Sequence, residues 1–147
     1  VRNALQLARR NGALTVLNPA PFKALDAGVL SLVDVIVPNE TESAACGGTQ
    51  VLLDAGVKTV LTTLGERGAI INTHTSAASI APHKVIAVDT VGAGDAFIGA
   101  LSAELARGAT ISDAAAVGAV AGALATTVHG AVPSLPTQSS VRSAMNK

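Results

Sequence analysis

Short apolar runs alternate with longer amphipathic segments along this chain. The runs at 13–18, 33–37 and 57–64 are rich in Val and Leu and are bounded by Gly, Pro or Asn, which predicts strands. Two further runs, 69–75 and 78–88, alternate between apolar and polar positions as the strands of a hairpin do. The remaining segments have helical spacing. We expect helices at 1–11, 22–32, 40–46, 49–55, 95–107, 112–128 and 138–146.

The order of these elements indicates the fold class. The first three strands are apolar on both faces, as buried parallel strands are, and they alternate with helices. Gly12 is well placed to end the first helix, and Ser112 is placed to cap the helix of 112–128. We therefore expect an α/β layered fold with a hairpin insertion, of a size that fits one compact domain.

Composition and charge exclude several kinds of partner. The 147 residues include ten Lys or Arg and ten Asp or Glu, so no net charge attracts the chain to nucleic acid. Two Phe and no Trp or Tyr leave little aromatic surface for stacking on bases. The longest uncharged apolar run, 114–128, is shorter than the ~20 residues of a membrane span, which favours a buried helix. The single cysteine, Cys46, cannot form an internal disulfide, so we expect a cytoplasmic protein without nucleic-acid or membrane partners.

The candidate chemistry lies in "AVDTVGAGDAFIGA", residues 87–100. A strand that ends near Val88 is expected to lead into a glycine-rich turn and then into a helix. The backbone N–H groups of this turn and the positive end of the helix dipole favour an anion such as phosphate. A carboxylate at Asp95, in the first turn, is placed to accept the proton of a hydroxyl that attacks the γ-phosphoryl group.

Two better-known glycine loops do not fit this stretch. The Walker A pattern needs a lysine, and none follows Gly94; the dinucleotide fingerprint needs a small residue where Phe97 stands. The alternative interpretation is that the glycines form only a tight turn and that Asp95 only caps the helix. The residues of the loop alone leave these two interpretations open.

The segment "DTVGAGDAF" resembles the second signature of the ribokinase-like (PfkB-type) sugar kinases. Four further segments resemble the same family in the same order: "NPAP" at 18–21, "PNETE" at 38–42, "TLGERGA" at 63–69 and "HGAVPS" at 129–134. The resemblance covers nearly the whole chain. "NPAP" and "PNETE" are similar to the ribokinase branch rather than to fructokinases or adenosine kinases.

This resemblance implies a three-layer α/β/α, Rossmann-like sheet. Nothing in residues 1–147 matches the family's sugar-binding "GGKGAN" segment or its β lid, so the chain resembles the C-terminal, nucleotide-binding half. By resemblance, Asp95 is the catalytic base that takes the proton of the sugar 5-hydroxyl and also contacts the sugar. Gly92, Ala93 and Gly94 form the anion hole for the transferred phosphoryl group.

The resemblance also implies an ATP site. Asn39 belongs to the family's Asn-x-x-Glu motif, and Glu42 helps to place Mg²⁺ through water; from the residues alone they form a helix capping box. Ala119 falls at the adenine pocket, although Gly118 and Gly122 near it also suit simple close helix packing. The implied nucleotide-binding residues are Asn39, Thr63, Leu64, Gly65, Glu66, Arg67, Gly68, Gly94, Asp95 and Ala119. The turn "TLGERG" has its own alternative, an ordinary strand-to-hairpin connection.

Ribokinases are activated by a monovalent cation, usually K⁺. Most of the matching positions would act through backbone carbonyl oxygens, and Asp89 carries the only formal charge among them. The implied K⁺ residues are Asp89, Val91, Ala125, Val128, Gly130 and Ser134.

The expected reaction is transfer of phosphate from ATP to D-ribose, which gives D-ribose 5-phosphate and ADP. Three alternatives stay open. The first is a related kinase that acts on fructose, on a sugar acid or on a nucleoside, and the second is a nucleotide-binding fragment without catalysis. The third is an oxidoreductase, which the absence of GxGxxG disfavours. The resemblance further implies a homodimer for a full-length protein.

Overall fold

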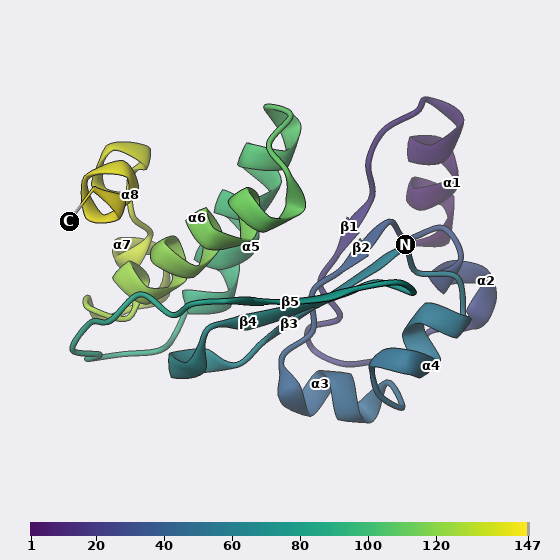
Figure 1. Cartoon of the computed structure of the whole chain (residues 1–147), viewed down its shortest axis with the longest axis horizontal. Coiled ribbons are helices and arrows are strands. Elements are labelled where there is room, and N and C mark those ends of the chain that lie inside the picture. Colours follow the sequence, from purple (N-terminus) through teal and green to yellow (C-terminus); the bar gives the residue numbers. More distant parts are fainter. Residues whose placement is uncertain (147) are drawn as a thin grey trace. The chain divides into compact units, whose positions relative to one another are not determined.

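The computed structural model describes residues 1–146 and shows two compact units (Figure 1). The first consists of Val1–Leu64 and Ile70–Ser79, and the second of Gly65–Ala69 and the chain from Ile80 onward. In the described part of the chain, no helix combines the length and the apolar character that crossing a bilayer requires.

The sheet contains five strands in the order in which they occur along the chain. Its strands are β1 (Val16–Leu17), β2 (Val35–Ile36), β3 (Thr59–Thr63), β4 (Ala69–Asn72) and β5 (Ala77–Ile80). The first three are parallel, with Val35 paired to Val16 on one side and to Thr59 on the other. Each lies within a run that the hydrophobic pattern predicts as a strand, and the α/β class is confirmed.

Helices of the first unit cover the parallel strands. These helices are α1 (Arg2–Arg10), α2 (Ala27–Leu30), α3 (Glu40–Ala45) and α4 (Thr49–Asp54). Apolar side chains of α1, α2 and α4 pack with β2 and β3 in one buried cluster that includes Leu5, Leu30, Ile36, Leu52 and Val60. Burial of these side chains against the sheet supplies most of the driving force for folding of this unit.

The second unit is helical. It contains the 3₁₀ turn η1 (Gly65–Arg67) and the helices α5 (Ala93–Ala106), α6 (Ile111–Ala125), α7 (Ala131–Ser134) and α8 (Gln138–Met145). A Cβ at Gly118 would lie 3.0 Å from the Phe97 carbonyl oxygen, and one at Gly122 would lie 3.1 Å from that of Ala93. The two glycines therefore let α6 approach the backbone of α5, as the packing interpretation of this pair expects.

Several predicted boundaries are wrong. The second strand of the hairpin ends at Ile80, not near Val88, and residues 81–88 form no regular element. The apolar side chains of Ile86 and Val88 are 90% and 52% exposed, so alternation in this stretch does not reflect a buried face. The predicted helix of 22–32 is reduced to α2.

Two errors concern helix starts. Thr110, rather than Ser112, caps α6: its side chain accepts the N–H of Asp113, 3.1 Å away. The short helix α7 starts at Ala131, between the predicted helices of 112–128 and 138–146, where no helix was predicted. Gly12, with φ of +69°, follows α1 as predicted.

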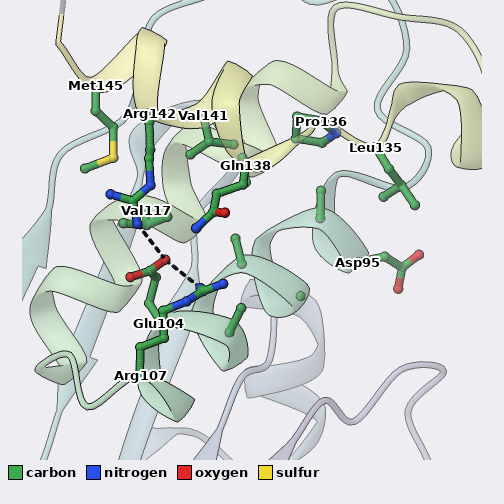
Figure 2. Close-up of a pocket in the computed structure, with 15 residues that line it drawn as sticks. Asp95, Glu104, Arg107, Val117, Leu135, Pro136, Gln138, Val141, Arg142 and Met145 are labelled. Carbon is green, nitrogen blue, oxygen red and sulfur yellow. Dashed lines mark hydrogen bonds and ion pairs between the residues drawn. The ribbon is translucent and has the colours of Figure 1, made fainter.

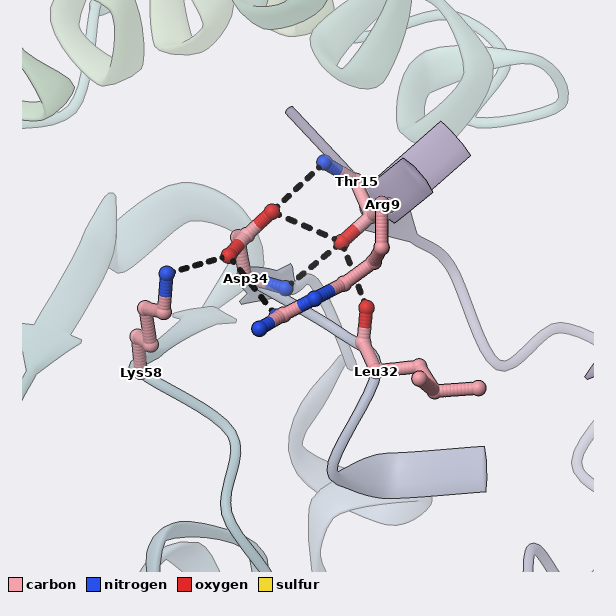
Figure 3. A network of polar contacts seen from close by, with 5 residues as sticks. All are labelled: Arg9, Thr15, Leu32, Asp34 and Lys58. Atoms are coloured by element: carbon pink, nitrogen blue, oxygen red, sulfur yellow. Dashed lines mark hydrogen bonds and ion pairs between the residues drawn. The ribbon is translucent and has the colours of Figure 1, made fainter. Parts of the chain in front are cut away.

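A polar network joins the starts of the parallel strands in the first unit (Figure 3). The Asp34 carboxylate accepts the N–H and the hydroxyl of Thr15, both at 2.9 Å, and lies 2.8 Å from Lys58 Nζ. The Thr15 hydroxyl in turn donates to the Leu32 carbonyl oxygen, and Arg9 Nη1 lies 3.5 Å from Asp34. These contacts connect α1, β1, β2 and β3 at the end of the sheet opposite Asn39.

Candidate functional site

The glycine loop has a conformation that only glycine adopts easily. Gly92 caps α5 with φ of +83°, and a Cβ there would lie 3.1 Å from Ala131 and 3.4 Å from the Ser134 hydroxyl oxygen. Ala93 and Gly94 follow in the first turn of α5; the Ala93 N–H donates to the Thr90 carbonyl oxygen at 3.3 Å, and the Gly94 N–H has no acceptor within the helix. Among the described residues, nothing lies within 4 Å of the position that a Cβ of Gly94 would take, so the loop is open at Gly94. This arrangement suits the approach of an anion.

Asp89 holds the glycine loop against the segment after α6. Its Oδ1 accepts the N–H of Val91 at 3.0 Å, and its Oδ2 accepts the N–H of Gly130 at 2.9 Å. These bonds, first that from Gly130, keep the pKa of the Asp89 carboxyl below its usual value, with a smaller contribution from His129 at 3.8 Å. The Thr126 carbonyl oxygen also accepts the N–H groups of Val88 and Asp89. The loop is therefore positioned by bonds that span the second unit.

The six residues implied as K⁺ ligands come together in this unit. Beyond the clamp of Asp89 with Val91 and Gly130, the Gly130 carbonyl oxygen accepts the Ser134 N–H at 3.2 Å. The Ala125 carbonyl oxygen accepts the Val128 N–H at 3.5 Å. Each carbonyl keeps a second lone pair for another donor or a cation. The Asp89 carboxylate is engaged by backbone N–H groups, so carbonyl oxygens are the donors that fit a monovalent cation here.

Asp95 lies in the first turn of α5 and is exposed. Its carboxylate makes no hydrogen bond or ion pair with any residue from 1 to 146. It stands at the edge of a cavity of about 460 Å³ formed by α5, α6 and α8 (Figure 2). Asp95 points away from the ion pairs of Glu104 at the other end of this cavity. A carboxylate in this position is free to accept a proton from a bound hydroxyl.

The first unit brings Asn39 next to Thr63. A parallel bridge joins Thr63, the last residue of β3, to Asn39 in the segment after β2, and the Thr63 N–H donates to the Pro38 carbonyl oxygen at 2.9 Å. Asn39 Oδ1 accepts the Glu42 N–H and Glu42 Oε2 accepts the Asn39 N–H, both at 2.8 Å. The capping box is confirmed, and it presents oxygen ligands at the carboxyl edge of the strands, which suits water-mediated contact with Mg²⁺.

The turn after β3 depends on two glycines with positive φ. Thr63 and Leu64 belong to the first unit, and Gly65, Glu66 and Arg67 form η1 in the second. Gly68 has φ of +87°, and a Cβ there would overlap the Ile80 carbonyl oxygen. Only glycine therefore fits at position 68, which suits either a ligand-binding turn or a tight connection. Ala119 is half-buried on α6.

Two contributors to the loop could not be identified from the sequence. Thr126 accepts two backbone N–H groups through its carbonyl oxygen, and Ala131 closes the space behind Gly92. Both residues act through backbone atoms, so no pattern of side chains in the sequence indicates them. The resemblance of "HGAVPS" to a family motif was the only available signal, because it marks the segment that contains Ala131. The described residues contain no cluster of three His, Cys, Asp or Glu side chains that could hold a metal.

Comparisons with known proteins agree with this geometry. The pfkB family carbohydrate kinase profile matches residues 1–138. A ribokinase from Staphylococcus aureus is 42% identical over 91% of this chain and 48% of its own length. A ribokinase from Haemophilus influenzae is 36% identical over 94% of this chain and 49% of its own length. The chain thus spans about half the length of these curated relatives.

Solved structures show the same partial match. Ribokinase from Thermotoga maritima superposes with a TM-score of 0.90 at 29% identity, over 98% of this chain and 52% of that one. Arabidopsis thaliana ribokinase, solved in complex with ribose and ATP, gives a TM-score of 0.86 at 26% identity, over 99% and 52% of the two chains. The fold of these 147 residues therefore occurs within proteins about twice as long.

Proposed function

Because the chain belongs to the pfkB family of carbohydrate kinases, we propose that it supplies the phosphoryl-transfer machinery of an ATP-dependent kinase for D-ribose. The observation that carries this proposal is the exposed, unpaired carboxylate of Asp95 beside a glycine loop that Asp89 holds in place. Similarity to ribokinases over more than nine-tenths of the chain supports ribose as the substrate.

In the proposed reaction, the 5-hydroxyl oxygen of ribose attacks the γ-phosphorus of ATP, and Asp95 accepts the proton of this hydroxyl. The bond from this phosphorus to the bridging oxygen breaks, and ADP leaves with the electron pair. Backbone N–H groups of Ala93 and Gly94 stabilise the charge on the transferred phosphoryl oxygens. A loose phosphoryl transition state depends mainly on such positioning and electrostatics.

We assign the nucleotide contacts to the residues that the family motifs indicate. Asn39 and Glu42 would orient water around Mg²⁺, which neutralises phosphate charge when it is bound. The turn Thr63–Gly68 would bind the nucleotide through its backbone, and Ala119 would contribute to an aliphatic adenine pocket. The close approach of Gly68 to the Ile80 carbonyl oxygen, which only glycine allows, supports this part of the assignment.

A monovalent cation is proposed beside the glycine loop. Carbonyl oxygens of the six residues described above are the donors that would hold K⁺, and a bound cation would stiffen the segment that Asp89 clamps. We expect faster turnover in potassium chloride than in sodium chloride at equal ionic strength. Equal rates in the two salts would remove the cation from the proposal while leaving the role of Asp95 untouched.

The substrate is tested by ADP release with a panel of acceptors. The polypeptide is expressed from its own gene, with whatever precedes Val1, and is assayed with ribose, fructose, a sugar acid and a nucleoside. We expect the highest kcat/KM with ribose and a product phosphorylated at O5. A higher value with another acceptor would assign the protein to a different substrate within the family.

A nucleotide-binding protein without kinase activity is the second candidate, because the chain spans about half the length of its relatives. It predicts ATP binding without ADP release in the presence of any sugar in the panel. Sugar-dependent ADP release would exclude it.

A further inference from the structure

The strand pair β1–β2 is short, and the segment that follows it leads to Asn39. Two residues of β1 pair with two of β2, and Leu17 is the second on its strand. Beyond this pair, the Val37 N–H donates to the Leu17 carbonyl oxygen at 2.8 Å. Asn39 lies two residues after Val37, so its position relative to β1 depends on what holds the chain beyond this bond.

A proline interrupts the ladder between the two strands at this point. Bonds in a parallel pair are evenly spaced, and those from Val35 to Thr15 and from Val37 to Leu17 follow this spacing. The next bond would run from the N–H of residue 19 to the Val37 carbonyl oxygen. Residue 19 is a proline, which has no N–H. Val37 is only 1% exposed, so its carbonyl oxygen needs another donor.

The side chain of Asn18 supplies the donor that Pro19 lacks. Its Nδ2 donates to the Val37 carbonyl oxygen at 2.9 Å, and the residue is half-buried. Loss of this donor would leave a buried carbonyl oxygen unpaired, which costs more free energy than the bond itself contributes. At the other end of the same strands, the side chains of Thr15 and Asp34 join β1 to β2 (Figure 3). Side chains thus hold this short strand pair together at both ends.

The bond of Asn18 lies directly before the start of α3. On the side of β3, the Thr63 N–H donates to the Pro38 carbonyl oxygen at 2.9 Å. Asn18 and Thr63 therefore hold two consecutive carbonyl groups from the two neighbouring strands. Asn39 comes next, and its capping box begins α3. The backbone that carries Asn39 is thus fixed from both sides.

We propose that Asn18 is a positioning residue for the binding of ATP with Mg²⁺. It acts through the Val37 carbonyl group, which sets where Asn39 and Glu42 stand at the edge of the sheet. This inference rests on the proposed contacts of these two residues with the nucleotide and Mg²⁺. Loss of the Asn18 amide should weaken nucleotide binding and spare the chemical step, because Asp95 and the glycine loop belong to the second unit.

Steady-state kinetics of Asn18→Ala test this split in the protein expressed from its own gene, with all residues that precede Val1. We expect the KM for ATP with Mg²⁺ to rise about tenfold, which corresponds to one buried hydrogen bond. The kcat and the KM for ribose should change by less than about threefold. A lower kcat with an unchanged KM for ATP would overturn the proposal, since loss of folded protein alone has that effect.

Asn11→Ala is the matched control for this variant. The Asn11 Nδ2 also donates to a backbone carbonyl oxygen, that of Leu7 at 2.8 Å, but Asn11 precedes β1 whereas Asn18 follows it. The control should leave kcat and both KM values unchanged. An equal rise of the KM for ATP in the two variants would overturn the specific role of Asn18.

A double variant tests how Asn18 acts. Pro19→Ala provides the backbone N–H that the ladder lacks, so it should return the KM for ATP of Asn18→Ala to within about threefold of the original value. A double variant as impaired as Asn18→Ala alone would overturn the proposal that the amide replaces a ladder donor.

Amide hydrogen exchange separates this inference from the proposed function. The N–H groups of Thr63 and Glu42 are bonded to the segment that Asn18 holds. Both should exchange about tenfold faster in Asn18→Ala than in Asn11→Ala, with no nucleotide present. Equal exchange would overturn positioning by Asn18 even in an active kinase. Faster exchange in a protein that releases no ADP would support the positioning and contradict only the proposed function.

Discussion

Asp34 and Asp95 belong to different units and are used in opposite ways. The Asp34 side chain is only 10% exposed and accepts two hydrogen bonds from Thr15 besides its ion pair with Lys58. Asp95 is exposed and has no partner among residues 1–146. The first carboxylate stabilises the fold because its charge is fully engaged, and the second is available for chemistry because its charge is not.

Asp89 shows how the second unit combines the two uses. Its carboxylate is engaged by the N–H groups of Val91 and Gly130, as that of Asp34 is engaged by Thr15. The bonds of Asp89, however, position a loop in which none of the described residues lies within 4 Å of the position that a Cβ of Gly94 would take. The bonds of Asp89 thus leave space beside Gly94, where we propose that the phosphoryl group binds.

The largest effect of a substitution is expected at Gly92, because the space behind the glycine loop is crowded there. Gly92 and Gly108 have φ of +83° and +86°, but only Gly92 has backbone atoms within 4 Å of the position that an added Cβ would take. Both Ala substitutions should cost about 1–2 kcal/mol of stability through the left-handed conformation. Only Gly92→Ala should also displace the loop and lower sugar-dependent turnover by about 100-fold. Steady-state kinetics that show equal turnover for the two variants would contradict this role of the loop.

The acid sensitivity of the first unit should depend on Asp34. Burial alone would raise the pKa of Asp34, but Lys58 and the donors of Thr15 outweigh it and hold the pKa below its usual value. A carboxyl with a lowered folded-state pKa contributes stability above its unfolded value of about 3.9 and loses that contribution as the pH falls through the folded value. Asp34→Asn should therefore cost about 2 kcal/mol at neutral pH, and less as the pH falls below about 4.

Urea titrations at a series of pH values measure how the stability loss of Asp34→Asn changes with pH, with Asp54→Asn as a control. Asp54 is exposed and bonds to Gln50 on α4, so its substitution should change stability by less than about 0.5 kcal/mol. If the free energy of unfolding lost in Asp34→Asn stays the same at the lowest pH measured, the charge of Asp34 is not what stabilises the strands.

The smallest effects are expected from two threonine substitutions that change the free energy of unfolding in opposite directions. Thr62 has a buried hydroxyl with no hydrogen-bond partner among the described residues, whereas the Thr15 hydroxyl contacts Asp34 and Leu32. Thr62→Val should raise the free energy of unfolding by about 1 kcal/mol, and Thr15→Val should lower it by about 1–2 kcal/mol. Losses of equal size in chemical denaturation would mean that the Thr62 hydroxyl has a partner after all.

Local signals predicted the features that depend on neighbouring residues. The spacing of Asn39 and Glu42 predicted their capping box, and Gly12 marked the end of α1. The parallel strands lie within the predicted runs because their apolar side chains face packed helices. The start of α6 was misjudged because Thr110 and Ser112 are both good caps, and only the bond to Asp113 distinguishes them.

Features that depend on distant parts of the chain were not predictable. The bond from the Gly130 N–H to Asp89 joins residues 41 positions apart, and no local pattern marks such a pair; the family resemblance implied a cation near Asp89 but did not imply this bond. The predicted strand does not continue to Val88, because a strand needs a neighbouring strand to pair with and alternation of apolar and polar residues does not reveal one. The functional assignments of Asp95, Asn39 and Ala119 stay predictions, since geometry alone does not report catalysis.

The central claim is that Asp95 is the base, and substitution by asparagine tests it most directly. Asp113→Asn is the matched control, because Asp113 is also an exposed aspartate in the first turn of a helix. In the protein expressed from its own gene, Asp95→Asn should lower kcat with ribose by about 10²–10⁴-fold. Its affinity for ATP, measured by calorimetry, should stay close to that of the unmutated protein, as should both properties of Asp113→Asn. A kcat for Asp95→Asn within tenfold of the unmutated value would contradict the account.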